Sequence, residues 1–146
     1  MNDIKNELNI LDEINKGATM GIDAIKEIKP KVKDRNFLNI LDIEESKYYK
    51  ISEKLNNIYK KFSDKDPHTP NQMEKTMASW GIEMKTFNDD TTSKLAELLV
   101  KGTNMGIIEG RRLLNHNPNS TEEVHSLLEE FVSMQENSVE SFKKYL

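Results

Sequence analysis

Apolar residues along this chain recur at spacings of three and four, which is the period of one face of an α-helix. No stretch alternates apolar and polar residues as a half-buried strand would, so the pattern predicts an all-α protein. Long helices are expected in four regions, which we place at about 3–29, 34–62, 91–115 and 120–145. A further amphipathic stretch covers residues 71–87.

The first two regions each carry a continuous inward stripe, and proline and aspartate set their limits. Pro30 ends the first helix, because the residue before a proline is pushed out of helical geometry. Asp34 is a suitable N-cap for the second. The first stripe is Ile4, Leu8, Leu11, Asn15, Ala18, Ile22 and Ile25, with Ile14 and Ile28 beside it. The second is Phe37, Leu41, Glu44, Tyr48, Ile51, Leu55, Ile58 and Phe62.

The last two regions follow the same design. Ser120 or Thr121, ahead of Glu122 and Glu123, comes close to a capping box and predicts the start of the final helix. The third stripe is Leu95, Leu98, Gly102, Met105, Glu109 and Arg112. The fourth is Val124, Leu127, Phe131, Met134, Ser138, Phe142 and Tyr145, with Leu128 and Gln135 beside it.

The connecting stretch has one apolar face, formed by Met73, Met77, Trp80, Met84 and Phe87. This face either covers the side of the bundle as core or binds a partner helix or a second copy through methionines around an aromatic anchor. Its register continues to Arg112, so residues 71–115 form one helix or two. One helix would be ~66 Å long and would overhang its ~40 Å neighbours. We favour a break at residues 88–90, with a dimer forming elsewhere on the bundle.

Composition narrows the class of protein. A length of 146 residues with 36% hydrophobic residues suits one domain with a bundle-sized core. The absence of cysteine excludes disulfides, thiolate metal sites and thiol nucleophiles. A net charge of -4, with both signs interspersed, offers no basic face for nucleic acid. No apolar run suits a membrane span and no signal peptide is recognisable, so we expect a cytoplasmic protein.

An internal repeat is the most informative feature. Residues 16–22, Lys-Gly-Ala-Thr-Met-Gly-Ile, reappear at residues 101–107 as Lys-Gly-Thr-Asn-Met-Gly-Ile, with five of seven positions identical. Residues 41–45 and 132–136 match more weakly. Two hairpins of similar design, at 3–62 and 91–146, joined by a crossover at 63–90, resemble the ferritin-like superfamily of four-helix bundles.

That resemblance implies a metal centre built from one Glu on each of two helices and Glu-x-x-His on each of the other two. Here the corresponding positions read Glu45-Ser-Lys-Tyr48 and Glu136-Asn-Ser-Val139, so both histidines are replaced. By the resemblance, Glu44 and Gln135 occupy equivalent positions, as if one copy of a metal-site carboxylate had become an amide. The resemblance therefore implies a degenerate metal centre.

The inward polar residues have two interpretations. They are Asn15, Glu44, Tyr48, Glu109, Gln135 and Ser138. As a structural layer they would hydrogen-bond one another and fix the helix register, since a buried carboxylate is costly without partners. Alternatively, Glu44 and Glu109, with neighbouring Glu45, form a reduced site for a hard cation. The first interpretation is favoured.

The glycines and histidines do not indicate a catalytic or cofactor site. The glycine pairs Gly17/Gly21 and Gly102/Gly106 would each weaken a helix, which close packing against another helix, or a ligand pocket, would offset. The three histidines are dispersed, and no nucleotide-binding or nucleophile motif is present. We therefore expect a non-catalytic, homo-oligomeric binding or structural module without a cofactor, with an unidentified protein partner left open. The alternative is a metal-binding protein with a reduced carboxylate site.

Overall fold

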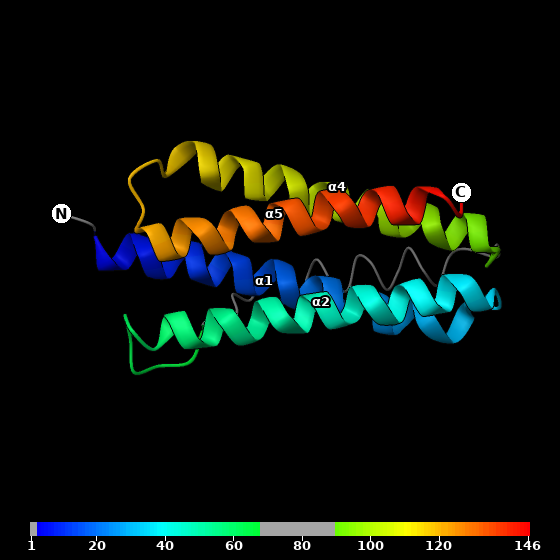
Figure 1. The fold of residues 1–146 in the computed structure, drawn as a ribbon, viewed down its shortest axis with the longest axis horizontal. Coiled ribbons are helices and arrows are strands. Elements are labelled where there is room, and N and C mark those ends of the chain that lie inside the picture. The colour runs from blue at the N-terminus through cyan, green and yellow to red at the C-terminus, as the bar shows by residue number, and fades with distance from the viewer. Residues whose placement is uncertain (1–2, 68–89) are drawn as a thin grey trace.

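The computed structural model describes residues 3–67 and 90–146, and these form an all-α bundle of four long helices (Figure 1). The helices are α1 (Ile4–Ile28), α2 (Arg35–Tyr59), α4 (Thr92–His116) and α5 (Glu122–Lys143), with a short 3₁₀ turn at Lys29–Lys31. The described residues contain no strand. The expected all-α fold class is confirmed.

Each helix begins at a side chain that caps it. The carboxylate of Asp3 accepts from the Lys5 backbone N–H at 3.0 Å, and that of Asp34 accepts from Phe37 N–H at 2.9 Å. The hydroxyls of Thr91 and Thr121 accept from the N–H groups three residues on, at 3.3 and 3.4 Å. These bonds satisfy N–H groups that a helix leaves free at its start. Pro30 lies in the 3₁₀ turn that ends α1.

The helices form two antiparallel hairpins whose turns lie at opposite ends of the bundle. In Figure 1 the turn between α1 and α2 is at one end, and the loop between α4 and α5 is at the other. Helix α1 packs mainly on α2, and α4 packs mainly on α5. The hairpins meet through α2 with α5 and through α1 with α4. Because the two turns lie at opposite ends, α1 and α4 run in opposite directions.

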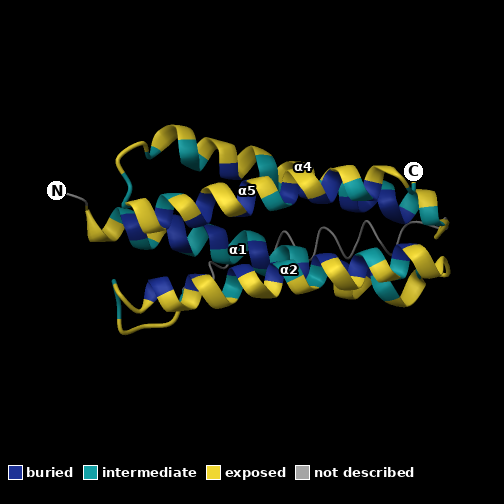
Figure 2. Cartoon of the chain, in the orientation of Figure 1, coloured by how far each residue is buried: buried dark blue, intermediate teal, exposed yellow. Residues whose placement is uncertain are grey.

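The core runs along the whole bundle between the four helices (Figure 2). One end is closed by aromatic rings, where Phe37 stacks on Tyr145 with ring centroids 4.7 Å apart and meets Phe142 edge-on at 6.4 Å. In the middle, Tyr48 and Phe131 meet edge-on at 6.2 Å. Such pairs stabilise a core beyond their buried area.

Helix α1 is rotated from its predicted face. Ile4 is 58% exposed and Asn15 is only partly buried, whereas Glu7 and Ile10, which lie outside the predicted stripe, are buried. The inward stripe is therefore centred on Leu11 and its neighbours at positions 7, 14 and 18. One residue of this face, Glu7, has a hydrogen-bond partner outside its own helix, described below.

The second half of α4 also differs from the prediction. Leu95 and Leu98 are buried as expected, but Met105 is 56% exposed, and Glu109 and Arg112 lie at the surface. Thr103 and Gly110 turn inward instead. The helix presents its glycine face to α5 because side chains of α5 come too close to leave room for a Cβ there. The inward placement of Glu109 was therefore wrong.

The single-helix alternative for residues 71–115 is also wrong. Asp90 and Thr91 are not helical, and Thr91 has the extended dihedrals φ -61° and ψ 154° of an N-cap. Helix α4 therefore begins afresh at Thr92. The apolar face of Met73, Met77, Trp80, Met84 and Phe87 lies outside the described residues.

Among the helices of the described residues, none has the length and apolar character required to cross a membrane.

Candidate functional site, a cavity between the two repeats

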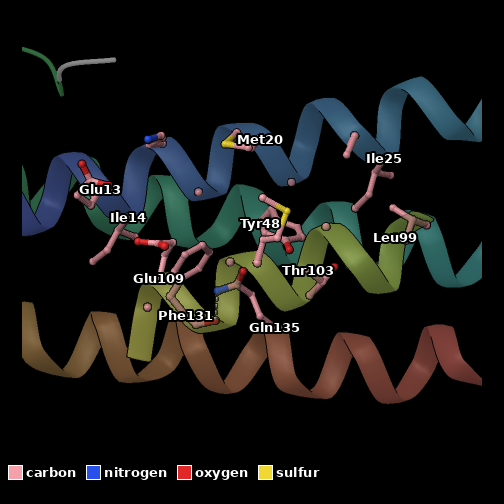
Figure 3. A pocket seen from close by; sticks show the side chains of 18 of the residues that line it. Glu13, Ile14, Met20, Ile25, Tyr48, Leu99, Thr103, Glu109, Phe131 and Gln135 are labelled. Atoms are coloured by element: carbon pink, nitrogen blue, oxygen red, sulfur yellow. Dashed lines mark hydrogen bonds between the residues drawn. The ribbon is translucent and has the colours of Figure 1, made fainter. Parts of the chain in front are cut away.

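A cavity of about 280 Å³ lies at mid-bundle between α1 and α4, with α2 and α5 closing its inner side (Figure 3). Its apolar lining comes from all four helices and includes Ile14, Met20, Ala24, Ile25, Tyr48, Leu99, Met105, Leu113, Leu128, Phe131 and Phe142. The charged and polar side chains in the lining are Glu13, Lys16, Thr103, Glu109 and Gln135. A mostly apolar concavity with a few polar groups is the usual form of a small-molecule site.

The two copies of the internal repeat form the facing walls of this cavity. Lys16, Gly17, Met20 and Gly21 contribute from α1, and the second copy contributes Gly102, Thr103, Met105 and Gly106 from α4. Because the two helices are antiparallel, the two copies of the repeat run in opposite directions along the facing walls. The feature that marks the duplication in the sequence is thus also the feature that builds the cavity.

The glycines admit side chains of neighbouring helices to the helix surface. A Cβ at Gly21 would lie 2.4 Å from the Tyr48 ring, and one at Gly17 would lie 2.9 Å from the Phe131 ring. On α4, a Cβ at Gly106 would meet Gln135 Oε1 at 2.0 Å. Gly17, Gly21 and Gly106 thus leave room for side chains of neighbouring helices, and all three, with Gly102, line the cavity.

Two alanine variants test whether the side chain packed against each glycine can move. We expect Gly21→Ala to destabilise by about 1–3 kcal/mol, because the Tyr48 ring is buried and cannot yield. Gly106→Ala should be close to neutral, since its clash is with the flexible end of Gln135 and alanine favours the helix by about 1 kcal/mol. Urea unfolding followed by circular dichroism compares the two. Equal effects would show that the Tyr48 ring does not constrain Gly21.

The inner side of the cavity carries a small polar group of residues. The Tyr48 hydroxyl is hydrogen-bonded to the Thr103 side chain. Burial raises the pKa of the Tyr48 phenol well above its usual range, and the nearby Glu44 carboxylate adds to this, while the Thr103 hydrogen bond opposes it. Tyr48 therefore stays neutral at any physiological pH. Gln135, from α5, is 2% exposed and lies close to this pair (Figure 3).

Next to Tyr48, Glu44 is buried with two partners. It is 1% exposed; Ser138 of α5 is hydrogen-bonded to its Oε2, and Lys47 Nζ lies 3.1 Å from Oε1. The lysine is partly exposed, so its charge compensates the carboxylate from the edge of the core. Glu44 and Ser138 thus form a polar contact between the two hairpins.

The carboxylates considered as metal ligands do not lie close to one another. The Glu109 side chain is 66% exposed and lies 2.5 Å from Arg112, while Glu45 accepts a hydrogen bond from Lys29 Nζ at 3.2 Å. Glu136 is paired with Arg111 at the surface. In residues 3–67 and 90–146 no three His, Cys, Asp or Glu side chains come together as a metal site would require. His116 is exposed, His125 pairs with Glu129, and His68 lies outside the described residues.

Sequence reasoning missed the buried Glu7. Its carboxylate accepts from the Thr121 backbone N–H at 2.9 Å and is hydrogen-bonded to the Thr121 hydroxyl at 3.3 Å. Glu7 therefore stabilises the start of α5, where a negative charge is also favoured by the helix dipole. The available signal was the position of Glu7, one turn before Leu11 and two turns before Ile14, on the same face as both.

Known proteins do not identify the chain. No family model matches the sequence, and comparison with curated proteins and with solved structures gives no match either. Function must therefore be inferred from the geometry of this chain alone.

Proposed function

We propose that the chain is a non-catalytic, ferritin-like bundle of the cytoplasm that acts as a binding module. Its binding site is the cavity between α1 and α4, and the metal centre of the ferritin-like design is degenerate. The observation that carries the proposal is a cavity of about 280 Å³ walled by two copies of one repeat. The arrangement of two hairpins with turns at opposite ends supports the ferritin-like resemblance. We further propose that the protein is a homodimer.

Binding is favoured over the alternative of a reduced carboxylate site for metal. Glu44 is already compensated by Ser138 and Lys47, and Glu109 is held at the surface by Arg112. A hard cation would need several oxygen ligands converging on one point. The cavity, in contrast, is lined mainly by carbon, so burial of an apolar molecule would supply its affinity.

Binding can be measured as stabilisation of the full chain by a small apolar probe. We expect indole, at about ten times its dissociation constant, to raise the free energy of unfolding by about 1.4 kcal/mol, because it binds only the folded state. Calorimetric melting of the full chain with and without indole gives this value. A melting temperature that does not change up to the solubility limit of indole would contradict the proposal.

Two leucine variants on α1 provide a matched comparison. Ala24 lines the cavity, and Ala24→Leu would fill part of it, so the stabilisation by indole should be lost. Glu27 lies exposed on the same helix, and Glu27→Leu should leave the stabilisation unchanged. If both variants responded to indole like the parent chain, the probe would bind elsewhere.

Metal content tests the degenerate centre. Protein produced with added iron and manganese, and purified without a chelator, should hold less than about one equivalent of transition metal, because Tyr48 and Val139 stand where the family's design has histidines. Mass spectrometry with plasma ionisation measures the content. A stoichiometric pair of metal ions per chain would instead support the metal-binding alternative.

A further inference from the structure

Gln135 is a buried amide with unused hydrogen-bonding capacity. A side-chain amide can donate two hydrogen bonds and accept two. Within residues 3–67 and 90–146, its one hydrogen bond runs from Nε2 to the Phe131 carbonyl oxygen at 3.4 Å, and Oε1 accepts none. The side chain is 2% exposed and lines the cavity. Because Gln135 lines the cavity and Oε1 has no protein partner, this acceptor is available to a ligand or a water molecule in the cavity.

The missing partner of Oε1 is not supplied by the neighbouring polar residues. Among the described residues no hydrogen bond joins Oε1 to the Tyr48 hydroxyl, and the Ser138 hydroxyl donates to Glu44 and to the Met134 carbonyl instead. On the α4 side, Oε1 occupies the space that a Cβ at Gly106 would take. The remaining surroundings of the amide are the cavity and its carbon lining.

We propose that Gln135 selects the ligand of this cavity, and that the ligand is a small, largely apolar molecule with one N–H or O–H group that donates to Oε1. The inference rests on the proposed binding function and specifies the chemical class that the site accepts. The apolar body would lie between Met20 of α1 and Leu99 of α4, with its donor directed towards α5 (Figure 3).

Selection follows from the cost of a wrong occupant. An apolar molecule of the same shape without a donor would displace water from the cavity and leave Oε1 buried and unpaired. Sites built around a hydrogen bond discriminate strongly against analogues that lack the group. Gly106 contributes to this selection, since a side chain at that position would displace the amide from its present place.

The test compares indole with 1-methylindole, which keeps the ring system but replaces the N–H donor with a methyl group. Titration calorimetry of the full chain should give a dissociation constant for 1-methylindole about tenfold higher than that for indole. Gln135→Met keeps the length of the side chain and removes the acceptor, so the two constants should become nearly equal. Naphthalene, which has no donor, should bind like 1-methylindole in both proteins.

Each outcome has one meaning. Equal affinities of indole and 1-methylindole in the parent chain would overturn the role of Gln135 while leaving the binding function intact. A preference for indole that persists in Gln135→Met would assign the acceptor to another residue and would also overturn it. If neither compound bound the parent chain but both bound Trp80→Ala, the chain's own tryptophan would occupy the cavity, and the proposed function would fail.

Discussion

Replacing Phe131 by alanine should lower the free energy of unfolding by about 3–5 kcal/mol, because it removes a buried aromatic ring at mid-bundle. The ring meets Tyr48 edge-on at 6.2 Å and lies against the backbone of α1 at Gly17. Its loss would leave a void next to the existing cavity, which the glycine walls cannot fill. Urea unfolding followed by circular dichroism measures the change. Phe131→Leu, which retains most of the volume, should cost about 1.5 kcal/mol or less.

The contact between Phe131 and Gly17 can be isolated with a double variant. In the parent chain, Gly17→Ala would place a Cβ 2.9 Å from the ring, so the helix-forming advantage of alanine is offset. In the Phe131→Ala background the clash disappears, and Gly17→Ala should stabilise by about 1 kcal/mol. An equal effect of Gly17→Ala in both backgrounds would show that the ring does not rest on this glycine.

Replacing Glu44 by alanine should cost about 1–3 kcal/mol, because the change leaves Ser138 and Lys47 without their shared partner. Glu44→Gln should be near neutral or stabilising, since the amide still accepts a hydrogen bond and the cost of burying a charge is removed. Thermal and urea unfolding of the two variants give the comparison.

The variants Glu44→Ala and Glu44→Gln also show whether the carboxylate is part of a structural polar layer or a metal ligand. If Glu44→Gln caused a large loss of stability together with release of bound metal, the carboxylate would be a ligand rather than part of a structural layer. Glu136→Gln is a suitable control, because this carboxylate lies at the surface beside Arg111 and its removal should change stability by less than about 1 kcal/mol.

Much of the fold follows from local properties of the sequence. The three-and-four spacing identifies every described helix, and capping chemistry at Asp34 and Thr121 locates two of their starts. Glu44, Tyr48, Gln135 and Ser138 lie buried at positions where the stripes place them. In these cases each polar residue is surrounded along its own helix by strongly apolar neighbours, so periodicity alone fixes the direction of the side chain.

The failures concern residues whose position depends on a distant partner. Glu7 is buried because its carboxylate meets Thr121, which is 114 residues away in sequence. Glu109 is exposed because glycines, which carry no apolar side chain and so add little to a hydrophobic stripe, occupy the inward face of α4. The repeat was visible in the sequence, but only the antiparallel arrangement of α1 and α4 shows that its two copies enclose a cavity.

The most direct test of the binding function uses the glycines themselves. The chain has six glycines, and all except Gly81, which lies outside the described residues, line the cavity between α1 and α4. Selective ¹⁵N labelling of glycine therefore places five amide signals at the proposed site. On addition of indole, these five signals should shift together and follow one single-site binding curve. Signals that stay in place, or a shift confined to Gly81, would contradict the assignment of this cavity as the binding site.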